Sequence, residues 1–211
     1  MNGFLAAFLR HGFDHTFVRY DEAWLRLAEE LAHEQSALIL SDVGVKYPAL
    51  IEQGLALDDA LERVLETDAA LQATFLYRIS HALFRREPQH DALRYYAQLM
   101  RVRTAIELYY STAIGPRLRI VHGAGAIIGP RNTIGSDFTF YQGVTLGQRR
   151  QFSPHETMVI GDGCTIFAGA KLLGALRLGD RVKVAANAVL LNDAESDGVY
   201  IGNPARKYER L

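Results

Sequence analysis

Two residues that could transfer a proton stand fifteen positions apart in the second half of the chain. His122 lies in the segment His122-Gly123-Ala124-Gly125, and Glu107 precedes it. A hydroxyl is a poor nucleophile near neutral pH and needs an adjacent base, a task that suits neutral histidine. A carboxylate on the other ring nitrogen fixes the tautomer and stabilises the imidazolium that forms. The alternative is a surface histidine and a solvated carboxylate, so the fold around the two residues decides between these interpretations.

The composition is that of an ordinary globular protein. Of 211 residues, 49% are apolar and 22% are charged, which excludes a disordered or collagen-like chain. Lys and Arg number 23 and Asp and Glu number 24, a net charge of -1, so we expect no nucleic-acid partner. Cys164 is the single cysteine, which excludes an intramolecular disulfide and a cysteine-based zinc cluster and favours a reducing, cytoplasmic environment.

The sequence predicts no membrane span. It has no stretch of about 18 consecutive apolar residues. Its first segment, MNGFLAAFLRHGFDH, lacks a basic stretch before the apolar run, and no small-residue cleavage site follows. We therefore expect an amphipathic helix at this end.

The first half of the chain, to about residue 105, has apolar residues at helical spacing. One amphipathic run covers Trp24 to Ala32, and further runs cover about 58–65, 68–83 and 91–108. Asp91 is the expected N-cap of the last run. Pro48 and Pro88 mark breaks between helices.

From about residue 107 the apolar residues recur every six positions, which is typical of a solenoid. The run has a two-residue shift after its third member and a gap after its seventh. Its members are Ile114, Ile120, Ala126, Ile128, Ile134, Phe140, Leu146, Ile160, Ile166, Leu172, Leu178, Val184 and Leu190. This period predicts a β-helix with three short faces and about 18 residues per coil. A β-sandwich, the alternative, would alternate with period 2 and vary in turn spacing.

Glycines and one gap interrupt this regular pattern. Glycine often follows the inward aliphatic, as at Gly115, Gly135 and Gly161, and we expect it to supply the backbone freedom that tight corners need. The gap between Leu146 and Ile160 holds the polar segment QRRQFSPHE, which we expect to loop out of the coils. Long excursions from a regular scaffold are common places for function.

At this point the sequence resembles a known family. The runs VHGAGAIIGPRNTIGSDFTFYQGVTLG, FAGAKLLG and IGNPAR are similar to the hexapeptide-repeat acyltransferases, and within them to the serine O-acetyltransferases. The resemblance covers about residues 60 to 206. It implies an α + β fold: an α-helical N-terminal domain over 1–106, followed by a left-handed parallel β-helix acyltransferase domain over 107–211.

The resemblance also implies a reaction. The family uses acetyl-CoA to acetylate a hydroxyl, and its His-x-x-Gly element matches the segment beginning at His122, which makes His122 the expected general base. Counting back without a gap places Glu107 at the family's orienting carboxylate. In a coil of about 18 residues, a separation of fifteen puts the two on neighbouring coils.

Five residues match positions where the family holds CoA. The pantetheine arm lies along the outside of the β-helix, where small residues let it approach the backbone, and a cation lies near the phosphates. The matching small residues are Gly147, Ala168, Gly169 and Ala186, and the matching cation is Lys183. The alternatives are corner geometry for the small residues and a solvated side chain for the lysine.

The acceptor site departs from the serine pattern. Val121 stands where the family has an aspartate that contacts the acceptor's amino group, and a site that buries an ammonium wants a carboxylate. In the shortened loop, Arg149, Arg150 and His155 are candidates for the family's Arg-His pair. Asp68 is the nearest match to an acceptor-binding aspartate of the helical domain; its alternative role is a helix N-cap.

We therefore predict an acetyl-CoA-dependent O-acetyltransferase for L-serine or a serine-like small-molecule acceptor, with no metal. A sugar O- or N-acetyltransferase and a non-catalytic scaffold remain alternatives. A γ-class carbonic anhydrase would need three histidine ligands for zinc, and the β-helix region has two, His122 and His155. The resemblance implies a homotrimer or a dimer of trimers, with active sites between subunits.

Overall fold

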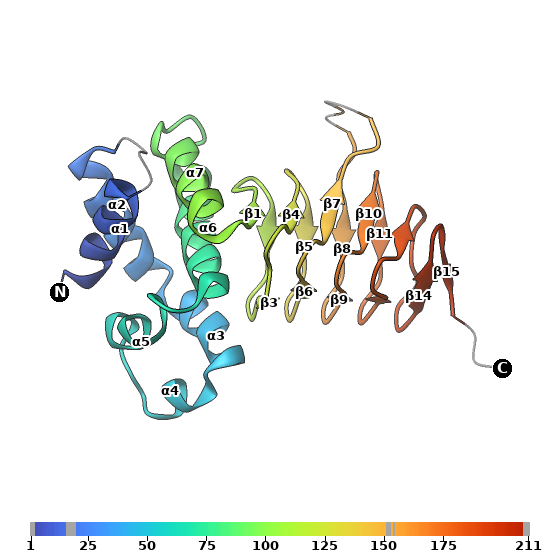
Figure 1. Ribbon diagram of the computed structural model, residues 1–211, viewed down its shortest axis with the longest axis horizontal. Helices are drawn as coiled ribbons and strands as arrows, with labels where there is room; N and C mark the ends of the chain where they lie inside the picture. The colour runs from blue at the N-terminus through green and yellow to red at the C-terminus, as the bar shows by residue number, and fades with distance from the viewer. Residues whose placement is uncertain (1–2, 16–19, 151–152, 154, 209–211) are drawn as a thin grey trace. The chain divides into compact units, whose positions relative to one another are not determined.

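The chain forms two compact units, Met1–Ala105 and Ile106–Leu211. The computed structural model describes residues 3–15, 20–150, 153 and 155–208. The first unit is helical and the second is a parallel β-helix, as the period change near residue 107 predicts (Figure 1).

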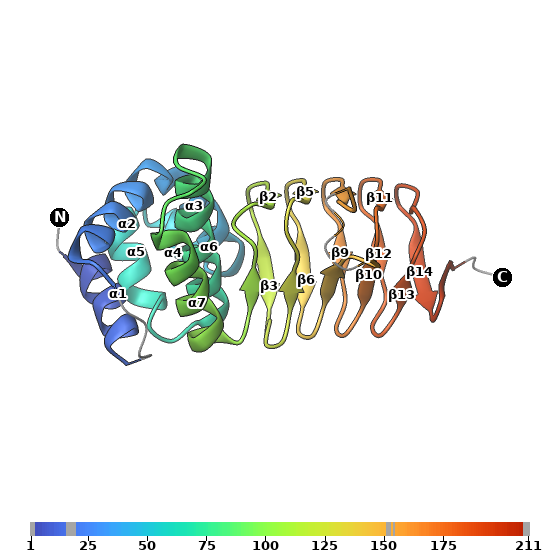
Figure 2. The same cartoon turned by 90° about the horizontal axis from the view of Figure 1, so that it is seen from above.

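Helix α6 is the centre of the first unit. Its residues Ala70 to Ser80 are all buried, and the polar Gln72, Thr74 and Ser80 among them donate to backbone carbonyls. Helix α7 lies alongside α6 in both views (Figures 1 and 2). The helices of this unit are α1 Phe4–Asp14, α2 Glu22–Glu34, α3 Ser36–Lys46, α4 Pro48–Glu52, α5 Leu57–Val64, α6 Ala69–Arg86 and α7 Ala92–Thr104. No helix in the described part of the chain is long and apolar enough to cross a lipid bilayer.

A buried ion pair joins α3 to α6. The Arg78 guanidinium donates from Nε to Asp42 Oδ2 at 2.7 Å and from Nη2 to Oδ1 at 3.1 Å. Both side chains are at most 1% exposed. Neither charge would tolerate this burial alone, so the two-point contact fixes how the helices pack.

The N-terminal caps of α6 and α7 agree only in part with those predicted from the sequence. The Asp68 side chain caps α6 by accepting from the Ala70 and Leu71 amides at 3.0 and 3.2 Å. Asp91 occupies the N-cap position of α7, as predicted, but its side chain makes no capping hydrogen bond, and its carboxylate accepts from Arg94 Nη2 instead. His90 takes the capping role, because its Nδ1 accepts the Ala92 amide at 3.1 Å.

The second unit winds through three sheets. Sheet A contains β1, β4, β7, β10 and β13; sheet B contains β2, β5, β8 and β11; sheet C contains β3, β6, β9, β12, β14 and β15. All pairings are parallel except that of β14 with β15. The strands are β1 Glu107–Leu108, β2 Ala113–Ile114, β3 Arg119–Val121, β4 Ile127–Ile128, β5 Thr133–Ile134, β6 Thr139–Tyr141, β7 Thr145–Gly147, β8 Val159–Ile160, β9 Thr165–Ile166, β10 Lys171–Leu173, β11 Arg177–Leu178, β12 Lys183–Val184, β13 Val189–Leu190, β14 Val199–Gly202 and β15 Ala205–Lys207.

The six-residue period is confirmed. All thirteen predicted inward residues are buried, and the most exposed of them, Ile114, is 6% exposed. The twelve that lie in strands stack on their counterparts one coil away, as Phe140 does on Ile166, whereas Ala126 lies in the turn between β3 and β4. The three sheets form the faces of a triangular prism, and the turns between strands form its three edges. We name each edge by the sheets that it joins in chain order: A-to-B, B-to-C and C-to-A.

The expected reason for the glycines after the inward residues is wrong. Gly115, Gly135, Gly161 and Gly179 do not have left-handed φ angles. A Cβ on Gly161 would instead lie 2.8 Å from the Gly179 carbonyl carbon and 2.9 Å from the next amide nitrogen. These glycines are needed because adjacent coils touch at the B-to-C edge.

Candidate active site

His122 occupies an enlarged turn at the C-to-A edge. Five residues, 122–126, separate β3 from β4, whereas three, 142–144, separate β6 from β7. The two extra residues are the phase shift seen in the sequence. His122 has a left-handed φ of 63°, and Gly123 and Gly125 follow with φ of 81° and 73°. This unusual backbone presents the exposed imidazole outside the prism.

Glu107 lies one coil before this turn. It begins β1, where it pairs in register with Ile127 of β4, and its amide donates to the Ala126 carbonyl at 2.9 Å. The backbone of Glu107 is therefore bonded to the last residue of the turn that holds His122. The carboxylate is half-buried on the outer face of sheet A. Glu107 is thus paired with the strand that directly follows the turn of His122.

Three of the five expected CoA contacts share the edge of His122. Ala168, Gly169 and Ala186 form the C-to-A turns of later coils, and the Asn187 amide donates to the Ala168 carbonyl at 2.9 Å. Gly169 has φ of 71°, and a Cβ there would clash with the Asn187 side-chain oxygen. The Asn187 side chain therefore lies over Gly169, while Ala168 and Gly169 are half-buried and Ala186 is exposed along this edge.

The other two expected CoA contacts lie elsewhere on the prism. Gly147 ends β7, at the A-to-B side of sheet A. Lys183 begins β12, at the B-to-C side of sheet C, with its side chain exposed. Each lies one strand length from the edge of His122, Gly147 on sheet A and Lys183 on sheet C.

The polar loop after β7 leaves from the A-to-B edge. Its backbone is held by Glu156, whose Oε2 accepts from the amides of Arg149 at 2.6 Å and Arg150 at 3.2 Å. The Arg149 side chain reaches the next coil and donates from Nε to the Leu173 carbonyl at 2.9 Å. His155 is exposed in the same loop. These residues and His122 belong to different edges, so one chain does not bring them together.

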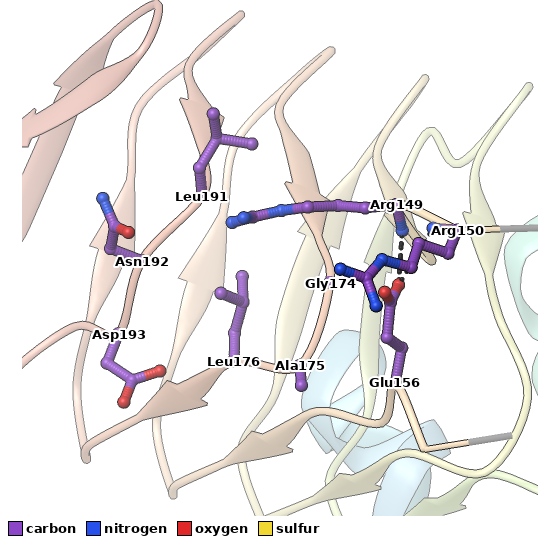
Figure 3. Close-up of a pocket in the computed structure, with 9 residues that line it drawn as sticks. All are labelled: Arg149, Arg150, Glu156, Gly174, Ala175, Leu176, Leu191, Asn192 and Asp193. Carbon is purple, nitrogen blue, oxygen red and sulfur yellow. Dashed lines mark hydrogen bonds between the residues drawn. The ribbon is translucent and has the colours of Figure 1, made fainter. Parts of the chain in front are cut away.

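A cavity of about 600 Å³ lies beside this loop (Figure 3). Arg149 and Arg150 reach over it from the loop, and Asn192 and Asp193 approach it from a later coil. The Asp193 carboxylate accepts the Arg177 amide at 2.8 Å. The cavity thus has cationic and anionic sides, which suits a zwitterionic or polar ligand.

Asp68 belongs to the helical unit and is fully engaged there. Besides capping α6, its carboxylate pairs with Lys46 Nζ at 2.5 Å and accepts from the Tyr47 hydroxyl at 2.9 Å. Burial alone would raise the pKa of Asp68, but the Lys46 ammonium, the Leu71 amide and the Tyr47 hydroxyl together hold that pKa below its ordinary value. The N-cap alternative is thus observed, and an acceptor contact remains a prediction.

Sequence reasoning missed Lys171. From β10 its ammonium donates to the Gly143 carbonyl and to Thr145 Oγ1 at 3.1 Å. The Gly143 amide in turn donates to the Ala124 carbonyl at 3.0 Å. Lys171 therefore anchors the turn stacked on that of His122. The feature of the sequence that could have identified Lys171 is its position: it is the first outward-facing residue of β10, next to the C-to-A edge.

The described residues contain no group of three or more His, Cys, Asp and Glu side chains that could hold a metal ion. The single cysteine, Cys164, is buried, and burial raises the pKa of its thiol. The raised pKa makes this thiol a poor nucleophile near neutral pH.

Comparison with known proteins identifies relatives over most of the chain. Over 165 residues the chain is 39% identical to the serine acetyltransferase of Helicobacter pylori, covering 72% of this chain and 96% of that protein. The fold matches the crystal structure of Neisseria gonorrhoeae serine acetyltransferase with a TM-score of 0.79 at 21% identity, over 98% of this chain and 79% of that one.

A third match is the serine acetyltransferase of Brucella abortus in complex with coenzyme A. Its TM-score is 0.74 at 23% identity, over 89% of this chain and 74% of that one. Models of known protein families give no match.

Proposed function

This chain belongs to the serine acetyltransferase family and is an acetyltransferase, and we propose that it transfers the acetyl group of acetyl-CoA to the hydroxyl of L-serine or a serine-like acceptor. The observation that carries the proposal is the enlarged C-to-A turn, which presents His122 on the same edge as Ala168, Gly169 and Ala186. That edge offers a base next to an open track for the donor.

His122 acts as the general base in this proposal. A ring nitrogen takes the proton from the acceptor hydroxyl while the oxygen attacks the thioester carbonyl. The carbon–sulfur bond then breaks, and the imidazolium returns the proton to the departing thiolate of CoA. Glu107 is proposed to orient the ring and to stabilise its charged form, in keeping with its place on the adjacent coil.

The donor is proposed to lie along the C-to-A edge. Ala168, Gly169 and Ala186 let the pantetheine arm approach the backbone, and Lys183 and Gly147 are proposed to contact it from the flanking faces. An exposed lysine on sheet C suits the phosphate end of the donor, because an ammonium binds phosphate as a compact charge.

The acceptor site is proposed to need a second copy of the chain. Arg149, Arg150 and His155 lie at the A-to-B edge, whereas His122 lies at the C-to-A edge. In a trimer the loop of one subunit would meet the base of its neighbour, and helical units could pair trimers. Sedimentation should show a trimer or hexamer; a stable monomer would contradict a shared site.

One observation favours a second candidate function, a sugar acetyltransferase. The residue before His122 is Val121, partly exposed, with Tyr141 as its neighbour in register. Neither supplies the anion that an amino acid's ammonium calls for. A sugar hydroxyl or amine needs no such anion.

Thiol release from acetyl-CoA, measured with L-serine, homoserine and a panel of sugars, tests the proposal. Release with L-serine supports serine O-acetylation. Release with sugars alone keeps the enzyme and its base but moves the acceptor to the second candidate. If the protein does not bind CoA, the donor assignment is wrong.

A further inference from the structure

An apolar column runs along the outer face of sheet C, beside the C-to-A edge. Val121 and Tyr141 pair in register, and the rings of Tyr141 and Phe167 stack at 5.2 Å between centroids, with 25° between their planes. The column continues through Ala185 to Ile201, which is 41% exposed. An apolar outer column is unusual for a sheet face that meets solvent.

The neighbouring column of the same strands is different. Two positions earlier, β3, β6, β9 and β12 present Arg119, Thr139, Thr165 and Lys183 on the outside. In β3, β6, β9 and β12, apolar character is therefore confined to the column that adjoins the C-to-A edge. In β14 the other column also carries an apolar residue, Val199, which is in register with Lys183 and 36% exposed. This contrast indicates a bound apolar group there and not a general property of the sheet.

The aromatic pair lies between the proposed base and the proposed donor track. Val121 directly precedes His122 in the first coil, and Phe167 directly precedes Ala168 in the third. Tyr141 belongs to the coil between them. A donor that runs along the edge with its thioester near His122 must place its acyl group and the adjoining pantetheine segment beside these rings.

We propose that Tyr141 and Phe167 form a rigid wall that sets the length of acyl group the enzyme accepts. This inference rests on the proposed function, since it takes the donor to be an acyl-CoA bound at the C-to-A edge. Two stacked rings move aside less easily than single aliphatic side chains do, because each ring has few rotamers and packs against the other. An acetyl group fits against such a wall, and each added methylene competes with it for space.

The test compares acetyl-, propionyl- and butyryl-CoA as donors for the wild type and for Tyr141→Ala. Fitting or rejecting one methylene in an apolar site changes kcat/KM by about 10–200-fold. We expect Tyr141→Ala to raise the butyryl-to-acetyl ratio of kcat/KM at least about 10-fold, and Phe167→Leu to raise it less. Thr139→Ala is the matched control, since Thr139 faces outward from the same strand; it should leave the ratio unchanged.

Calorimetric titration with acetyl-CoA and butyryl-CoA separates this inference from the proposed function, because it needs no acceptor. If the wild type binds neither donor, the proposed function itself fails. If the wild type binds acetyl-CoA, but Tyr141→Ala and Phe167→Leu leave the preference for chain length unchanged, the wall is overturned. A change in Thr139→Ala as large as in Tyr141→Ala would overturn it too.

Discussion

Replacing Gly161 by alanine tests whether close contact between coils is what requires glycine at the B-to-C edge. The new Cβ would lie 2.8 and 2.9 Å from backbone atoms of Gly179 and Asp180, whereas carbon atoms pack comfortably at about 3.5–4.0 Å. The two coils would have to separate by more than about 0.5 Å. That movement strains the bond in which Asp180 Oδ1 accepts the Asp162 amide at 2.9 Å.

The expected cost follows from these two effects. Overpacking costs about 1–3 kcal/mol, and the weakened hydrogen bond adds about 1 kcal/mol. The sum, about 2–4 kcal/mol, lowers the unfolding midpoint of a chain of this size by about 4–16 °C. Thermal unfolding followed by circular dichroism measures this midpoint.

Gly163→Ala in the same coil is the matched control. Gly163 has a left-handed φ of 68°, but the nearest atom to its Cβ would be a flexible side-chain carbon, Arg181 Cγ, at 3.2 Å. A left-handed alanine costs about 1–2 kcal/mol. We therefore expect Gly161→Ala to lower the unfolding midpoint more than Gly163→Ala does, although Gly161 has an ordinary φ. A larger loss of stability in Gly163→Ala than in Gly161→Ala would refute the reasoning.

Three further predictions concern the ion pair, the helix cap and the orienting carboxylate. Arg78→Met removes the cation that pairs with the buried Asp42 carboxylate and should cost about 3–5 kcal/mol in urea unfolding; adding Asp42→Leu should recover most of it, and no recovery would contradict the pairing argument. Asp68→Asn keeps the capping oxygen but removes the charge. Because the folded-state pKa of Asp68 is lowered, the wild type should be more stable than this variant above the unfolded carboxyl pKa of about 4, and the difference should vanish as pH falls through the folded pKa; a pH-independent difference would count against it. Glu107→Gln should lower kcat at least about 10-fold with little change in the KM for acetyl-CoA, and a change in KM alone would show that Glu107 does not act through His122.

The solenoid could be predicted from sequence because its inward residues form one uninterrupted stack. Each coil must bury one apolar side chain on each of its three faces, so apolar residues recur every six positions from Ile160 to Leu190. The two-residue shift at Ala126 was visible too, and the structure shows it to be the enlarged turn of His122. The role of the glycines was not predictable, since it depends on the distance between coils and not on the local backbone.

The site was less predictable than the fold, because its residues come from different edges. A linear pattern can place His122 beside the coil of Glu107, but it does not tell which edge the loop of Arg149 leaves from. Lys171 was missed because its partner is a backbone carbonyl one coil away. The N-cap position of Asp91 was predicted, but not the loss of its capping hydrogen bond, because the neighbouring His90 side chain accepts the Ala92 amide.

The role of His122 is tested most directly by thiol release from acetyl-CoA by His122→Ala, measured with an acceptor on which the wild type is active. Loss of a general base should lower kcat by about 10²–10⁴-fold, while calorimetry should show CoA binding unchanged, because the donor track lies on later coils. A His122→Ala enzyme with kcat within a few-fold of the wild type would contradict the assignment of His122 as the base.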